Sequence, residues 1–303
     1  MRKKLILVML SVTLVFPNRV YADNLNQIQV DVQNNESNYS EGSVGSNLLG
    51  ITAATISFPE IEGYYPELGE AYVIQKAQIR TSASVNSSSK GVLDIGTKVN
   101  VTGYEGDWAK TENGYIYAGL LSDKFTYKAN IHGKNMNSLR YAGYLYKSIC
   151  DLDEPLRSLA ENISITLVDS RKDLVNEAAE LGDKTVGYTM HYRGTDRSEI
   201  RIWANTGSMK KDIIHELGHA FDYSVDGSKG LIYSDEDEWK LIYEKEKEAY
   251  ASKMSSNEHN TSDQREYFAD CIEKYIVNHD ELKEACPESF TYIENILNKN
   301  LEQ

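Results

Sequence analysis

One short segment constrains this sequence more than any other: His215-Glu216-Leu217-Gly218-His219. Two histidines four positions apart lie on one face of an α-helix, so both imidazoles can point at a single ion. The glutamate between them projects beside that ion, where it can take a proton from water. The pattern therefore predicts a helix that carries a metal site, with His215 and His219 as ligands and Glu216 as general base.

The surrounding residues favour this helix. Ser208 is a suitable N-cap, and Gly227 follows the expected end. The strand expected at 198–204 is placed to act as the sheet edge against which an extended peptide lies. Apolar side chains at helical spacing give the helix a buried face, namely Ile213, Ile214, Leu217, Ala220 and Phe221.

A catalytic zinc site needs a third protein ligand and one open position. Asp222 and Val225 stand where the metzincin pattern has Gly and His, so this ligand must come from elsewhere. The helix expected at 262–277 offers it, because Glu266 and Asp270 lie four residues apart on one side of it. We expect Glu266 to be the third ligand and Asp270 to hold a ligand histidine by its other ring nitrogen.

The N-terminal segments have a different character. Residues 1–22 predict a signal peptide, because basic Arg2-Lys3-Lys4 precedes an apolar run, 5–16, that is too short to cross a bilayer comfortably. We therefore expect secretion, and no membrane insertion once this segment is removed. Residues 23–70 are rich in Asn, Gln, Ser and Glu, which predicts a flexible linker.

Residues 71–126 predict a small all-β module. Short β-type runs alternate there with turn dipeptides such as Gly96-Thr97 and Asn113-Gly114. The segments QIRTSAS, IGTKVNV, DWAKT and NGYIYAGLL, in that order, resemble a bacterial SH3 domain. The resemblance implies an SH3-like barrel that binds peptidoglycan or its cross-bridges; a spacer barrel without a ligand is the alternative.

Charge excludes some partners. The chain has 32 basic and 46 acidic residues, a formal charge of −14. Such a surface repels phosphate backbones and anionic lipids, so we expect no nucleic-acid partner.

The three cysteines, Cys150, Cys271 and Cys286, do not have the spacing of a thiolate zinc site. Outside the cytoplasm an odd number leaves at least one free thiol, and a bridge between Cys271 and Cys286 is one option for the others. The alternative is that all are small buried apolar side chains.

From residue 127 onward the chain resembles the anthrax lethal factor-like zinc metallopeptidases, which include secreted Pro-Pro endopeptidases. The segments HELGHAFD, EYFADCIEKYI and ACPESFTYIENI carry this resemblance. It implies an α+β fold of the zincin type over 127–303, with the cleft between a mixed sheet and a mostly helical lobe. It also implies one Zn²⁺ bound by His215, His219 and Glu266, with Glu216 as general base.

One position departs from the family pattern. The family usually has a tyrosine seven residues before the ligand glutamate, where it stabilises the oxyanion, and this chain has His259 there. Three roles are open to His259: it donates a hydrogen bond in place of the tyrosine, it ligates the metal, or it faces solvent. Tyr223 and Tyr250 are the candidate substitutes for the missing tyrosine.

Together these observations predict a secreted zinc metalloendopeptidase that hydrolyses proteins outside the cell or on its surface, held at the wall by its SH3-like module. Two alternatives stay open. The first is a peptidoglycan hydrolase, because SH3-type modules often accompany such enzymes. The second is a wall-binding protein with a structural zinc site, which a fourth protein ligand such as His259 would favour.

Overall fold

The structure is a computed structural model of the whole chain, and it describes residues 65–126, 128, 130–177, 185–192, 195, 197–205, 207–224, 231–254 and 260–299. The predicted signal peptide, and the predicted linker up to residue 64, lie outside this part. The described residues all belong to one compact unit. Among the described helices, none is long and apolar enough to span a bilayer.

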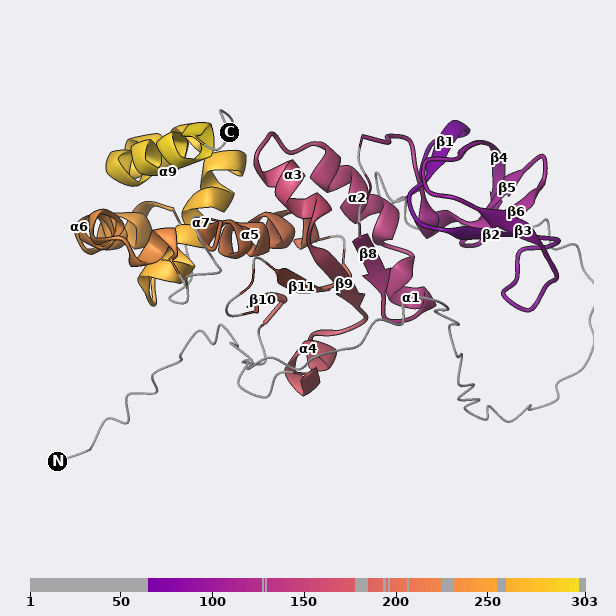
Figure 1. Cartoon of the computed structure of the whole chain (residues 1–303), viewed down its shortest axis with the longest axis horizontal. Coiled ribbons are helices and arrows are strands. Elements are labelled where there is room, and N and C mark those ends of the chain that lie inside the picture. Colours follow the sequence, from indigo (N-terminus) through magenta and orange to yellow (C-terminus); the bar gives the residue numbers. More distant parts are fainter. Residues whose placement is uncertain are drawn as a thin grey trace, which may run out of the picture. The chain divides into compact units, whose positions relative to one another are not determined.

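The N-terminal module is all-β, as predicted, and each described pair of neighbouring strands is antiparallel (Figure 1). Gly114 allows a tight turn into one hairpin: its φ is 140°, and a Cβ there would lie 2.4 Å from the Arg80 carbonyl oxygen. The strands are β1 (Gly69–Val73), β2 (Ala77–Arg80), β3 (Ser89–Leu93), β4 (Lys98–Glu105), β5 (Trp108–Thr111), β6 (Gly114–Tyr117) and β7 (Leu121–Ser122), in the spatial order β3-β2-β6-β5-β4-β1-β7, with the 3-10 helix η1 (Ala118–Leu120) before β7.

A second, four-stranded sheet is mixed, with the order β10-β11-β9-β8. Its strands are β8 (Asn130–Gly133), β9 (Ser164–Val168), β10 (Gly187–His191) and β11 (Ser198–Trp203). The β8–β9 and β9–β11 pairs are parallel, whereas β10 and β11 are antiparallel.

The expectation that the strand at 198–204 forms the edge of this sheet is wrong. β11 pairs with β9 on one side and with β10 on the other, so among the described strands β10 is the edge strand on this side of the sheet and β8 is the one on the other side. The physical reason is that β10 and β11 fold as an antiparallel pair, and it is the second of the two that meets the parallel strands.

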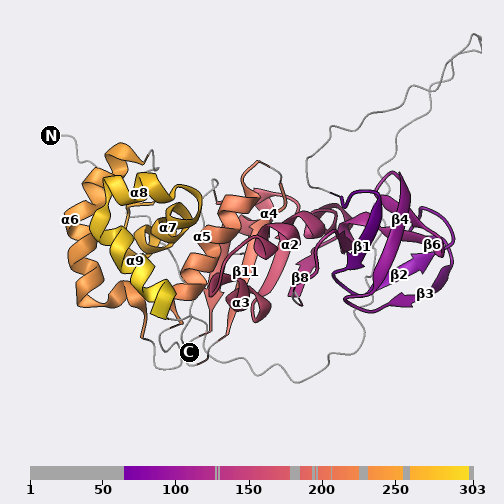
Figure 2. The ribbon, with the colours of Figure 1, turned by 90° about the horizontal axis from the view of Figure 1, so that it is seen from above.

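The remaining elements are helices, which lie around the second sheet and in a lobe at the C-terminal end (Figures 1 and 2). Helix α5 packs against β10 and β11 and also against α7, and therefore joins sheet and lobe. The helices before the lobe are α1 (Met136–Leu139), α2 (Ala142–Cys150), α3 (Leu156–Glu161), α4 (Arg171–Glu177) and α5 (Met209–Asp222). The lobe contains η3 (Tyr233–Asp235), α6 (Asp237–Lys253), α7 (Gln264–Val277), α8 (His279–Ala285) and α9 (Pro287–Lys299). The expected mixed sheet with a helical lobe is thus confirmed.

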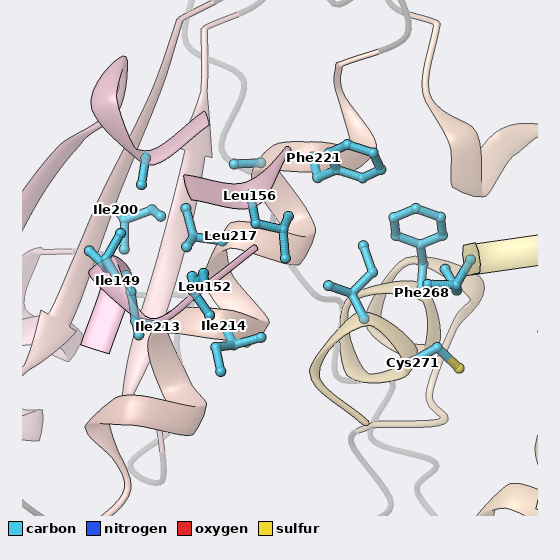
Figure 3. Packing of buried hydrophobic residues seen from close by; sticks show 14 of the residues in the cluster. Ile149, Leu152, Leu156, Ile200, Ile213, Ile214, Leu217, Phe221, Phe268 and Cys271 are labelled. Atoms are coloured by element: carbon cyan, nitrogen blue, oxygen red, sulfur yellow. The ribbon is translucent and has the colours of Figure 1, made fainter. Parts of the chain in front are cut away.

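One hydrophobic core extends from the second sheet through α5 into α7. Figure 3 shows Ile213 and Leu217 of α5 on the side of Ile200, with Phe268 and Cys271 of α7 beyond them. These five side chains are fully buried, which removes their apolar surface from water and holds α5 between sheet and lobe.

The three cysteines belong to the same core. All are free and buried in the structure, so a bridge between Cys271 and Cys286 is absent among these described residues. They act as small apolar side chains, the alternative that the sequence left open.

Candidate metal centre

Helix α5 presents the His-Glu-x-x-His segment. It spans Met209–Asp222, close to the expected bounds, and Ser208 occupies the N-cap position. The Ser208 hydroxyl does not cap the helix backbone; it donates to Asp212 Oδ2 at 2.6 Å instead. Gly227, expected to follow the helix, lies outside the described residues.

The two histidines lie one helical turn apart and face α7. Their ring centroids are 4.8 Å apart with an interplanar angle of 86°. Their side chains are only 16% and 18% exposed, so His215 and His219 point into a largely enclosed space.

Helix α7 supplies the third candidate ligand in its first turn. Asp263 caps this helix, because its side chain accepts hydrogen bonds from the backbone N–H groups of Arg265 and Glu266 at 2.8 and 3.1 Å. Glu266 then reaches both imidazoles: its Oε2 lies 3.4 Å from His215 Nε2, and its Oε1 lies 3.5 Å from His219 Nε2.

These separations fit a zinc site. Nitrogen and oxygen ligands at the usual bond length around a tetrahedral zinc ion lie about 3.3 Å from one another. The candidate ligand atoms of His215, His219 and Glu266 all lie within 4.8 Å of one another. The three residues predicted from the sequence as metal ligands are therefore brought together with the spacing that zinc requires.

Asp270 lies on the far side of His215. Its Oδ1 is 3.8 Å from His215 Nδ1, the ring nitrogen that does not face Glu266. The Tyr250 hydroxyl donates to Asp270 Oδ2, and Lys274 Nζ lies 4.0 Å from Oδ1. Asp270 therefore lies at an ion-pair distance from a ligand histidine, and its predicted role in holding that histidine stays a prediction. Asp270 and Tyr250 are themselves fully buried.

A second set of potential metal ligands shares His215 and consists of His215, Asp270 and Glu273. Lys274 Nζ lies 2.9 Å from Glu273 and already neutralises this pair of carboxylates. Glu266 lies instead between the imidazoles of His215 and His219, which favours the set with Glu266 as the cation site.

Glu216 is 5% exposed and contacts the edge strand β10. Its Oε2 accepts a hydrogen bond of 2.7 Å from the Thr189 hydroxyl. Gly187 leaves room for the carboxylate, since a Cβ at that position would lie 2.9 Å from Glu216 Oε1. Sequence reasoning missed both strand residues, because nothing local to Glu216 indicates which strand lies beside it.

The two glutamates have opposite electrostatic surroundings. Burial acts to raise the pKa of Glu266, but the imidazoles of His219 and His215 outweigh it and hold that pKa well below its usual range. Burial prevails at Glu216 and raises its pKa, despite the two histidines and the Thr189 hydrogen bond. One carboxylate is thus suited to bind a cation and the other to accept a proton.

The histidines respond to the same carboxylates. Burial alone would lower the pKa of His215, yet the neighbouring carboxylates of Asp270 and Glu266 raise it well above its usual value. The pKa of His219 is also raised, because Glu266 outweighs burial. Without a cation both rings therefore favour a proton, and a metal ion has to compete with it.

The residues considered for oxyanion stabilisation are only partly described. His259 lies outside the described residues, so its predicted role stays a prediction. Tyr250 is fully buried and donates to Asp270, so it is not a substitute for the family tyrosine. Tyr223 stacks on His191 with ring centroids 3.9 Å apart.

A family model matches the part of the chain that carries this site. Residues 160–296 match the family model for the anthrax toxin lethal factor, N- and C-terminal domain. Among solved structures, the chain is similar to the Pro-Pro endopeptidase PPEP-2 from Paenibacillus alvei, with 16% sequence identity, a TM-score of 0.41, and coverage of 55% of this chain and 97% of that chain. The comparison with curated proteins found no match.

The matched range contains Glu216 and all three candidate ligands. Residues 160–296 therefore resemble a lethal factor domain, and the chain is a metallopeptidase with a His-His-Glu metal site.

Proposed function

We propose that this chain is a secreted zinc metalloendopeptidase that cleaves extracellular or cell-surface proteins. The observation that carries the proposal is the convergence of His215, His219 and Glu266, with the Glu216 carboxylate beside them. We further propose the division suggested by the sequence: a signal peptide at 1–22, a linker at 23–70 whose last two residues lie in β1, an SH3-like module at 71–126 and the peptidase domain at 127–303.

The donor set supports zinc as the cation. Two imidazole nitrogens and one carboxylate are typical of catalytic zinc sites, which leave a further position open. A zinc ion held there supplies Lewis acidity toward a carbonyl oxygen and makes water more acidic. Asp270 supports this set by its position 3.8 Å from His215 Nδ1, which favours the ring orientation that turns Nε2 toward Glu266.

Glu216 carries the proton transfer in this proposal. Its Oε1 takes a proton from the attacking water and passes it to the amide nitrogen that leaves, so the carboxylate is regenerated. Its raised pKa supports this role, because a base with a pKa closer to neutrality returns the proton more readily.

The edge strand supports an extended peptide as substrate. β10 has one neighbour among the described strands, which leaves its other side available for main-chain hydrogen bonds. Thr189 of this strand contacts Glu216, so a peptide paired with β10 would lie next to the proposed base. This arrangement favours a substrate that is extended around the cleaved bond over one that is compactly folded there.

The N-terminal module supports attachment to the wall. A hollow of about 220 Å³ opens on it, with Lys98, Asn100 and Glu112 among the lining side chains. A basic, an acidic and an amide side chain together can bind the charged and polar groups of a short peptide such as a cross-bridge. We propose that this module binds peptidoglycan and keeps the enzyme at the cell surface.

Digestion of a random peptide library by the zinc-loaded full chain tests the peptidase proposal, with purified cell wall as a parallel substrate. We expect cleavage of peptides, and its loss in Glu216→Gln with the zinc content unchanged. Glu238→Gln is the matched control, since Glu238 is exposed in the first turn of α6.

Two outcomes would contradict the proposal. Release of wall fragments without cleavage of library peptides would favour a peptidoglycan hydrolase. Full zinc occupancy with no cleavage of either substrate would favour a structural zinc site.

Sedimentation with purified wall, compared between the full chain and a Lys98→Glu variant, tests the attachment.

A further inference from the structure

Strand β10 turns alternate side chains toward helix α5, as a pleated strand does. Gly187 lies against Glu216 Oε1, and Thr189 donates to Glu216 Oε2. The next residue on this face, His191, stacks on Tyr223 just after the end of α5. One face of the edge strand thus follows the helix, and two of its positions contact Glu216.

The Glu216 carboxylate needs such a contact. A glutamate side chain has several rotatable torsions, so its carboxylate can adopt more than one orientation. A buried carboxylate without a hydrogen bond also has an unfavourable free energy of desolvation. Among the described residues, the hydrogen bond from Thr189 is the one that its carboxylate accepts. The same hydroxyl lies 2.9 Å from the Glu216 carbonyl oxygen, so it is placed against this residue from two directions.

Gly187 restricts the carboxylate from the other side. A Cβ at this position would lie 2.9 Å from Glu216 Oε1 and 3.1 Å from its Cγ, so the side chain fills the space that a larger residue would need. A hydrogen bond on Oε2 and close packing beside Oε1 together leave the carboxylate little freedom to turn.

We propose that Thr189 is a positioning residue for the peptidase reaction: its hydroxyl holds Glu216 Oε2 and thereby leaves Oε1 to receive the proton from water. This inference rests on the proposed function. Threonine suits the task because its branched side chain has few rotamers in a strand, so the hydroxyl keeps its direction.

The proposal separates two properties of β10. A peptide that pairs with this strand uses its backbone, which a change of the Thr189 side chain leaves in place. The proposed general base, Glu216, is instead contacted by the Thr189 side chain. Loss of the hydroxyl is therefore expected to lower kcat and to leave KM nearly unchanged.

The test measures kcat and KM of zinc-loaded full-length variants with a quenched fluorogenic peptide that contains the bond cleaved in the library. For Thr189→Val we expect kcat to fall about 10- to 100-fold and KM to stay within about twofold. Thr189→Ser retains the donor and is expected to keep kcat within about threefold of the wild type. Thr166→Val is the matched control, because Thr166 lies in β9 of the same sheet and makes no hydrogen bond through its hydroxyl among the described residues.

The outcomes are distinguishable. A Thr189→Val enzyme with wild-type kcat, a Ser variant that loses as much as Val, or an equal loss in Thr166→Val would overturn the role of Thr189. If Thr189→Val does not fold, Thr189→Ala takes its place in the same comparison. If Glu216→Gln cleaves the peptide as the wild type does, the proposed function itself is wrong.

Discussion

Gly218 on α5 packs against the backbone of Ala269 on α7. A Cβ on Gly218 would lie 2.9 Å from Ala269 Cα and 3.0 Å from its carbonyl oxygen. Such distances are closer than side-chain carbons approach backbone atoms, so the two helices can be this near only where one residue has no side chain. Since Glu266 lies one turn before Ala269, this approach brings the third ligand to the two histidines.

The first prediction concerns this close approach. Gly218→Ala should push α7 away from α5 and lengthen the distances from Glu266 to both imidazoles. We expect zinc affinity to fall about 10- to 100-fold, measured by competition with a chelating dye. Gly103→Ala is the control, because a Cβ there meets nothing within 4 Å. Unchanged affinity in Gly218→Ala would show that the helix separation does not limit zinc binding.

Sequence reasoning identified the features of this site that depend on spacing along a helix. His215 and His219 share a face because four residues complete about one turn, and Glu266 and Asp270 are related in the same way. The local apolar pattern also located α5. Each of these follows from periodicity, which is a property of neighbouring residues.

The features that it missed depend on which segments become neighbours in space. β11 was expected at the sheet edge, yet strand order is set by pairing between distant segments. Thr189 precedes its partner Glu216 by 27 residues, and Tyr250 precedes Asp270 by 20. No periodic signal connects such residues, so their contacts become visible only in the folded chain.

A second prediction follows from the buried carboxyl group of Asp222. Its two oxygens accept hydrogen bonds from the backbone N–H and the hydroxyl of Ser234, at 2.7 and 2.6 Å. Burial nevertheless raises the pKa of Asp222 from 3.8 to about 6. Because the folded state favours the protonated form, the associated stabilisation is complete below a pH of about 4 and is lost as the pH rises through about 6.

Asp222→Asn should remove this dependence. The amide stays neutral, its oxygen accepts from the Ser234 N–H, and its nitrogen donates to the Ser234 hydroxyl. Relative to the wild type, we expect the free energy of unfolding of the variant to rise between pH 4 and 7, by up to about 3 kcal/mol. Urea unfolding of both proteins at several pH values measures this difference. A difference that is constant with pH would contradict the assignment of the raised pKa to Asp222.

The third prediction concerns metal removal and its pH dependence. The pKa of His215 is raised well above 6.5 without a cation, so its ion pairs stabilise the metal-free protein fully below pH 6.5, and this stabilisation is lost as the pH rises through the folded pKa. Zinc binds the deprotonated rings and therefore gains affinity as the pH rises. The stabilisation by zinc should thus be small at acidic pH and larger at alkaline pH.

Thermal unfolding of the Glu216→Gln variant, with zinc or with a chelator, measures this effect without self-digestion. The free zinc concentration is set to 100 times the Kd at pH 8, where the expected stabilisation is about 2.7 kcal/mol, and the same concentration is used at every pH. His219→Ala should abolish the zinc-dependent shift in Tm at every pH. A shift of equal size at pH 5.5 and pH 8 would argue against the histidines as ligands.

The last prediction concerns the start of α9, which a buried glutamate of another helix holds. Glu246 of α6 accepts hydrogen bonds from the backbone N–H groups of Glu288 and Ser289 and from the Ser289 hydroxyl, at 3.0, 2.9 and 2.7 Å. A carboxylate at a helix N-terminus satisfies donors that the helix leaves free, and it interacts favourably with the helix dipole.

Glu246→Gln replaces one acceptor oxygen with an N–H₂ group that faces these donors, so we expect the variant to be destabilised by about 1–3 kcal/mol. Urea unfolding measures the change, with Glu248→Gln as the control because Glu248 is exposed two residues further along α6. Since Glu246 contacts α9 and not the metal ligands, kcat per folded molecule should match the wild type; equal stability of the Glu246 and Glu248 variants would mean that α9 is held by its apolar face alone.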